Sequence, residues 1–186
     1  MYRLLALAIT LLAMPPECSQ APQAQSGSRY IRQLDPSSPV IIFVHGALGD
    51  SISTWTTGKS YWPQLLTDDE AFAGASVYVL EYPTNLFSNG LNINQLSIDM
   101  RRTFEDSKID NHKELIFVAH SMGGLVVRDY LMTHQEAATK TRFIFFFSTP
   151  TIGSELANWA DLVSPSTEIK SPAGRRSMTN GTTGVK

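Results

Sequence analysis

A short apolar run that leads into a serine constrains the fold of this chain more than any other stretch. Leu115–Ala119 is continuously apolar, and Ser121 follows it after one further residue. Such a run is typical of a strand that is buried on both faces of a parallel sheet. Gly123 and Gly124 come next, and 125–131 has the composition of a helix. The sequence therefore predicts a tight strand-to-helix turn with Ser121 at its tip.

A serine on such a turn projects its hydroxyl above the carboxyl edge of the sheet, where the backbone N–H groups that follow converge on the same space. Small neighbours are needed because the backbone there is crowded and partly strained. Ala119, Gly123 and Gly124 supply them. Ser121 is therefore the candidate nucleophile. The plainer alternative is a buried strand that ends in an ordinary Ser-Gly turn.

The sequence Ala119-His-Ser-Met-Gly123 resembles the G-x-S-x-G nucleophile elbow of the α/β-hydrolase family, with alanine in place of the first glycine. A second resemblance lies upstream, where the apolar run Pro39–Val44 leads into His45 and Gly46. The oxyanion loop of that family begins with a His-Gly pair after a buried strand. The sequence also resembles the lipase and deacylase branch of the family over 39–157, about two-thirds of the chain.

This resemblance implies particular roles for the residues around Ser121. The backbone N–H groups of Ala47 and Met122 would donate to the oxyanion of a tetrahedral intermediate. His45 would brace the oxyanion loop rather than take part in the chemistry. Four residues would support the site by their position: His45, Gly46, His120 and Gly123.

Other segments complete an α/β fold. We expect further strands at 76–82 and 142–148, the second of them buried, and helices at 62–66 and from residue 92 onward. Ile93, Leu96, Met100 and Phe104 would share one face of the latter helix. Strand-helix alternation predicts right-handed βαβ units. The expected architecture is an α/β-hydrolase-like parallel sheet with helices on both faces, lacking the C-terminal strands.

The 186 residues suffice for one domain, and 42% hydrophobic with 17% charged residues fits a globular chain. We divide the chain into a signal peptide (1–21), a linker (22–38), a partial hydrolase core (39–163) and a polar tail (164–186). Arg3 and the apolar run after it predict a secreted or periplasmic protein. A lipoprotein anchored at Cys18 is the less favoured alternative, because 15–17 make a poor lipobox.

The histidine base of a catalytic triad is not evident. The family order is serine, acid, histidine, and the last of the four histidines here is His134. His112 would lie on the order of 20 to 30 Å from Ser121 across its strand. His134 would lie about 20 Å away along the following helix. His45 and His120 are at the correct edge, but one would brace the loop and the other would point away from its neighbour.

Glu155 and Asp161 are weak candidates for the catalytic acid. We therefore interpret the chain as a truncated serine hydrolase that acts on carboxylic esters or lipids through an acyl-enzyme on Ser121 and is weak or inactive in this form. An acyltransferase and a non-catalytic binding module are the alternatives. No cofactor or metal is expected, and the net charge of −2 gives no footprint for nucleic acid. The substrate would be a small-molecule or lipid ester, with transient contact with a membrane surface conceivable and the oligomeric state open.

Overall fold

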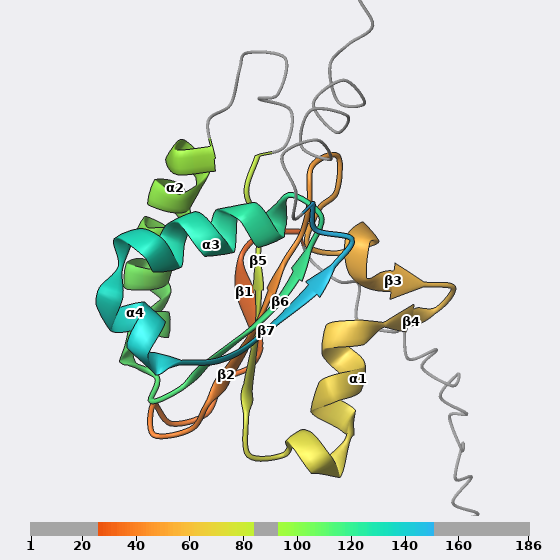
Figure 1. The fold of residues 1–186 in the computed structure, drawn as a ribbon. Coiled ribbons are helices and arrows are strands. Elements are labelled where there is room, and N and C mark those ends of the chain that lie inside the picture. Colours follow the sequence, from red (N-terminus) through yellow and green to blue (C-terminus); the bar gives the residue numbers. More distant parts are fainter. Residues whose placement is uncertain (1–25, 84–92, 151–186) are drawn as a thin grey trace, which may run out of the picture.

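A computed structural model describes residues 26–83 and 93–150 of the chain (Figure 1). The expected signal peptide and polar tail lie outside the described residues. So does the part of the expected core after Pro150, including Glu155 and Asp161. None of the helices within the described ranges is long and apolar enough to cross a membrane.

Five strands form the main sheet, in the order β1-β5-β2-β6-β7. Their bounds are β1 Arg29–Arg32, β2 Val40–Val44, β5 Ser76–Leu80, β6 Leu115–His120 and β7 Thr141–Phe147. The four strands from β5 to β7 in this order run parallel, while β1 pairs antiparallel with β5. A small hairpin of β3 (Thr56–Thr57) and β4 (Ser60–Tyr61) stands apart from this sheet. The predicted α/β sheet is confirmed, with one antiparallel edge strand added.

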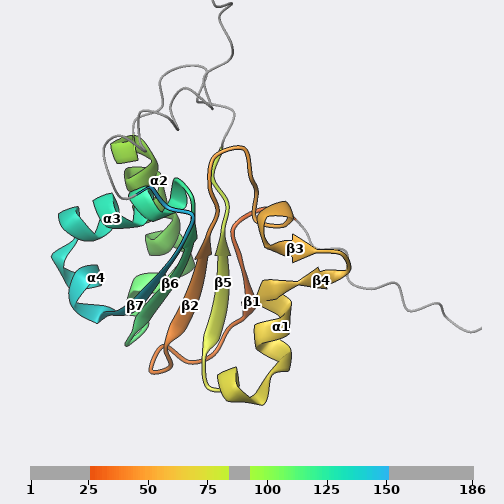
Figure 2. The same ribbon diagram turned by 45° about the vertical axis from the view of Figure 1, so that its right-hand side comes forward.

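Helices cover both faces of the sheet, as predicted (Figure 2). One face carries α2 (Ile93–Ser107), α3 (Gly123–Thr133) and α4 (Gln135–Lys140), and the other carries α1 (Trp62–Asp68). Short 3-10 turns lie at Ser53–Trp55, Glu70–Phe72 and Ile109–Asn111. The apolar residues of the two faces accordingly form two separate cores.

The predicted amphipathic helix is present as α2. Leu96, Met100 and Phe104 are buried against the sheet, while Arg101 and Arg102 face solvent. Burial of such a stripe supplies most of the stability of a surface helix.

The prediction that 22–38 form only a linker is wrong for part of this range, because residues 29–32 form strand β1. Tyr30 anchors this strand: its ring packs edge-on against Tyr78, with centroids 4.9 Å apart, and its hydroxyl donates to the Ser107 carbonyl. Little in the local pattern indicates this strand, since its four residues are only half-buried and alternate weakly. Pairing with β5 decides its conformation.

The prediction that the strand at 142–148 is buried is also wrong, because the side chains of β7 are largely exposed. Phe143, Phe145 and Phe147 are 60%, 51% and 40% exposed. The strand lies at an edge of the described sheet, where α1 reaches only Phe147, through the ring of Trp62 at a centroid distance of 5.3 Å. Its apolar composition alone did not reveal that position.

Candidate active site

The two motifs found in the sequence lie at one edge of the sheet. Strands β2 and β6 are neighbours and run parallel, with Val44 paired to Ala119 at their carboxyl ends. His45 therefore leaves β2 beside the place where Ser121 leaves β6. If His45 and Ser121 lay at opposite edges of the sheet, the predicted fold would be wrong.

Ser121 occupies a strained turn between β6 and α3. Its φ of 52° lies in the left-handed region, which costs a residue other than glycine about 1–3 kcal/mol. Its N–H donates to the Phe147 carbonyl (2.7 Å), and its carbonyl accepts from the Gly124 N–H (3.1 Å). The side chain is nearly buried, and its hydroxyl has no hydrogen bond to any residue that the structure describes. Hydrogen bonds thus hold the Ser121 backbone on both sides, while no described residue bonds to its hydroxyl.

Two glycines allow the elbow to approach the loop after β2. A Cβ added to Gly46 would lie 2.8 Å from the Ser121 Cβ, and one added to Gly123 would lie 2.3 Å from the His45 carbonyl oxygen. Both distances are shorter than real Cβ contacts, so only glycine fits. The oxyanion loop expected from the sequence therefore lies directly against the candidate nucleophile.

Helix α3 begins immediately behind Ser121, with Met122 as its N-cap residue. The first N–H groups of a helix have no partner within the helix, and the macrodipole makes this end favourable for negative charge. Among the described residues, neither the Met122 nor the Ala47 N–H donates a hydrogen bond. Their role as oxyanion donors stays a prediction.

His45 is buried completely and both of its ring nitrogens have partners. Nδ1 lies 2.9 Å from the Gly46 carbonyl oxygen, and Nε2 lies 3.3 Å from the Tyr82 backbone nitrogen. Its ring stacks on Tyr82, and the Glu81 carboxylate lies 3.7 Å from Nε2. Burial lowers the pKa of His45, although the Gly46 carbonyl and Glu81 oppose this effect. Both nitrogens of His45 are thus occupied by partners other than Ser121, which is consistent with the predicted role of a loop brace.

His120 precedes the serine and faces the indole of Trp55, with ring centroids 6.4 Å apart. Its Nδ1 is buried and has no hydrogen-bond partner among the described residues. Burial lowers its pKa, which favours the neutral imidazole.

The remaining histidines have structural roles. His112 is buried between the Ser38 carbonyl oxygen and the Tyr30 hydroxyl. The Nδ1 atom of His134 lies 2.9 Å from the Tyr130 carbonyl oxygen at the end of α3. No described histidine, and all four are described, forms a hydrogen bond to the Ser121 hydroxyl.

Sequence reasoning missed Glu81 and Tyr82, which it assigned to the end of a strand. The strand β5 ends at Leu80, and the two residues after it contact the loop that follows β2. Their position directly after a buried strand, at the same edge as Ser121, was the signal that could have found them.

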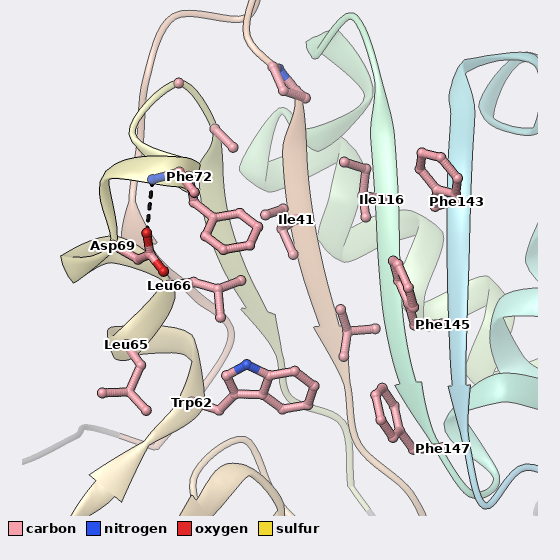
Figure 3. A pocket seen from close by; sticks show the side chains of 15 residues that line it. Ile41, Trp62, Leu65, Leu66, Asp69, Phe72, Ile116, Phe143, Phe145 and Phe147 are labelled. Carbon is pink, nitrogen blue, oxygen red and sulfur yellow. Dashed lines mark hydrogen bonds between the residues drawn. The ribbon is translucent and has the colours of Figure 1, made fainter.

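A large apolar cavity of about 870 Å³ lies elsewhere, on the α1 face of the sheet (Figure 3). Phe143, Phe145 and Phe147 of β7 form one side, and Trp62 and Leu66 of α1 form the other. Ser121 does not line it. The cavity is therefore part of the sheet face that α1 leaves uncovered. Within the described ranges, no group of three His, Cys, Asp or Glu residues is arranged to hold a metal ion.

The strained serine between a central parallel strand and a helix, with a glycine-led loop against it, places the protein in the α/β-hydrolase class. Residues 36–179 match the family described as "Putative serine esterase (DUF676)". Because this match covers more than half of the sequence, the chain belongs to that family.

The chain is also similar to several curated proteins and solved structures. The human protein SERAC1 is 28% identical over 178 residues, and the zebrafish (Danio rerio) protein SERAC1 is 25% identical over 178. Each match covers 75% of this chain and 26% of the relative, so the chain spans about a quarter of these relatives. A solved carboxylesterase of Nitrososphaera gargenis is 18% identical with a TM-score of 0.46, covering 75% of this chain and 48% of that one. The Bacillus licheniformis lipase BlEst2 is 21% identical with a TM-score of 0.42, covering 72% and 50%.

Proposed function

We propose that this protein is a serine hydrolase that acts on carboxylic esters through an acyl-enzyme on Ser121. The observation that carries the proposal is the left-handed backbone of Ser121 at the junction of β6 and α3, beside Gly46. Strain at a strand-to-helix turn is the geometry that exposes a nucleophilic hydroxyl. Membership of a serine esterase family supports the same reaction.

In the proposed reaction the Ser121 oxygen attacks the ester carbonyl carbon and its proton passes to a base. The carbonyl oxygen becomes an oxyanion, which the N–H groups of Ala47 and Met122 would stabilise. Collapse of this intermediate expels the alcohol and leaves the acyl group on Ser121; water then releases the acid. An acyltransferase would share every step except the last acceptor.

No described histidine of this chain is placed to act as the base for Ser121. His45 and His112 have both ring nitrogens engaged, and neither His120 nor His134 bonds to the Ser121 hydroxyl. Loss of the base from a serine triad removes several orders of magnitude in rate, while the oxyanion hole and binding retain about 10³- to 10⁴-fold over water. We therefore expect slow turnover. The same observation keeps a non-catalytic binding module as the second candidate.

The test supplies the missing base from solution. Hydrolysis of a short-chain activated ester is measured for the 186-residue protein and for Ser121→Ala, with and without imidazole. We expect little turnover without imidazole and an imidazole-dependent rate that is larger in the unsubstituted protein than in Ser121→Ala. Equal rates in both proteins would contradict the proposal and favour the binding module. Rapid turnover without imidazole, absent in Ser121→Ala, would show that the chain supplies its own base.

A further inference from the structure

Two residues after strand β5 hold the loop that follows β2 at both of its ends. The ring of Tyr82 stacks on the imidazole of His45, with centroids 4.2 Å apart and planes inclined by 17°, and its hydroxyl donates to the His45 carbonyl. The Glu81 carboxylate accepts the Ser51 N–H at 2.6 Å. Glu81 and Tyr82, called the loop clamp below, thus fix residues 45 and 51. Ala47 lies between these fixed points.

The backbone partners of His45 require one tautomer. The Gly46 carbonyl can only accept a hydrogen bond, so Nδ1 must carry the proton that it receives. The Tyr82 N–H can only donate, so Nε2 must be the unprotonated nitrogen. The Gly46 carbonyl and the Tyr82 N–H therefore select the neutral Nδ1–H form of His45. The Glu81 carboxylate, 3.7 Å from Nε2, favours a proton on that nitrogen instead, so Glu81 contributes by holding Ser51. Glu81, Asp50 and His120 are the charged or titratable groups that act on this ring.

This tautomer orients the peptide between Gly46 and Ala47. Peptide groups are planar and trans, and the described residues contain no cis bond. In a trans peptide the carbonyl and the N–H of one unit point in opposite directions. When the Gly46 carbonyl receives the Nδ1–H of His45, the Ala47 N–H must face away from the imidazole. Gly46 itself lies against Ser121.

We propose that Glu81 and Tyr82 are positioning residues for oxyanion stabilisation, because Tyr82 holds His45 and Glu81 holds Ser51, so that the loop between them presents the Ala47 N–H to the reacting oxygen. This inference rests on the proposed function of Ser121. Among the described residues, no hydrogen bond or ring contact joins the loop clamp to Ser121 or Met122, so it acts through the loop alone. A residue with this role changes binding of an oxyanion more than it changes stability.

The plain alternative is that Tyr82 is a core residue whose hydroxyl satisfies a buried carbonyl. Tyr78 offers a matched control, because it lies on β5 four residues before Tyr82, is buried, and donates or accepts one side-chain hydrogen bond with Ser107 at 2.8 Å. Tyr82→Phe and Tyr78→Phe each remove one buried hydroxyl. If Tyr82 only packs, the two substitutions will have the same consequences.

The binding test uses an alkyl trifluoromethyl ketone, followed by ¹⁹F NMR. The Ser121 oxygen adds to the ketone carbon, the C=O π bond breaks, and the serine proton passes to the new oxygen or to solvent. We expect Tyr82→Phe to weaken this adduct by roughly tenfold, about the value of one hydrogen bond, while Tyr78→Phe leaves its affinity unchanged. Glu81→Ala should weaken it also, and Glu81→Gln should restore it, because the amide oxygen can still accept the Ser51 N–H.

A second measurement does not depend on ester chemistry. Two-bond ¹H–¹⁵N correlations of His45 in the free protein distinguish the Nδ1–H from the Nε2–H tautomer, and we expect Nδ1–H. An Nε2–H ring would overturn the inference whatever the adducts show.

The outcomes distinguish the proposed function of Ser121 from the positioning role of Glu81 and Tyr82. Absence of an adduct in the unsubstituted protein, or an equal adduct in Ser121→Ala, contradicts the proposed function and the inference with it. An adduct that requires Ser121 but is equally strong in Tyr82→Phe and Glu81→Ala contradicts only the positioning role. If Tyr82→Phe does not fold, the Glu81→Ala and Glu81→Gln pair decides, because the Glu81 side chain is 24% exposed.

Discussion

Backbone strain at Ser121 indicates a nucleophile only together with the residues around it. Leu48, Lys108 and Ser148 also have φ values between 51° and 59°, so a left-handed serine is not by itself a nucleophile. Ser121 differs because a helix begins directly behind it and a glycine loop lies against its Cβ. The strain is tolerated because the Phe147 carbonyl and the start of α3 hold the turn on either side.

A substitution at Gly123 tests the close approach of the Ser121 turn to the backbone of Val44 and His45. In Gly123→Ala the added Cβ would lie 2.3 Å and 2.5 Å from the carbonyl oxygens of His45 and Val44, both backbone atoms that cannot move cheaply. We expect the free energy of unfolding to fall by about 1–3 kcal/mol or more, measured by urea denaturation.

Gly74→Ala is the matched control, since an added Cβ there meets no atom within 4 Å. It should be neutral, or stabilise the protein by about 0.4–1 kcal/mol through the unfolded chain. Equal losses of stability in the two variants would contradict the packing described for the elbow.

At the scale of elements, β7 combines a long apolar strand with an edge position. Edge strands present unpaired backbone groups, and exposed apolar side chains on them favour association. Phe143 and Phe145 are more than half exposed on the face that α1 leaves uncovered (Figure 3). This strand is therefore the described element most prone to self-association.

Replacing Phe145 by Thr should reduce aggregation, measured by light scattering at increasing concentration, while changing the urea midpoint little. Threonine keeps the β-propensity and removes exposed apolar area. Phe117→Thr serves as the contrast, because this residue of β6 is fully buried and should cost about 3–5 kcal/mol. Unchanged aggregation in Phe145→Thr would show that β7 is not the associating element.

Most of the elements follow from local pattern, whereas some parts of the site do not. Val40–Val44 and Leu115–Ala119 are continuous apolar runs, and the spacing of Leu96, Met100 and Phe104 identifies α2. The positions of His45 and Ser121 at one edge follow from parallel pairing.

The roles of Tyr30 and Tyr82 could not be predicted in the same way. Tyr30 contacts residues more than 40 positions away, and Tyr82 contacts His45 across 37 positions. Nothing in their own neighbourhoods specifies these partners. The single antiparallel strand and the loop clamp are therefore consequences of the assembled sheet.

At the scale of the whole molecule, the site is assembled from segments that follow β2, β5 and β6, and none of them could form it alone. The sheet brings their carboxyl ends together, as Figure 1 shows, and α3 adds its N-terminus. The chain belongs to a family described as putative serine esterases, and this assembly is compatible with that membership. The proposed function requires Ser121 to be the nucleophile.

Phosphonylation tests that claim most directly. The full chain is incubated for a long time with excess alkyl fluorophosphonate, whose fluoride leaves as the serine oxygen bonds to phosphorus, and the modified residue is found by intact-mass and peptide mass spectrometry. We expect a single, slow modification at Ser121 that accelerates with added imidazole and is absent from Ser121→Ala. Modification spread over other serines, or equal labelling of Ser121→Ala, would contradict it.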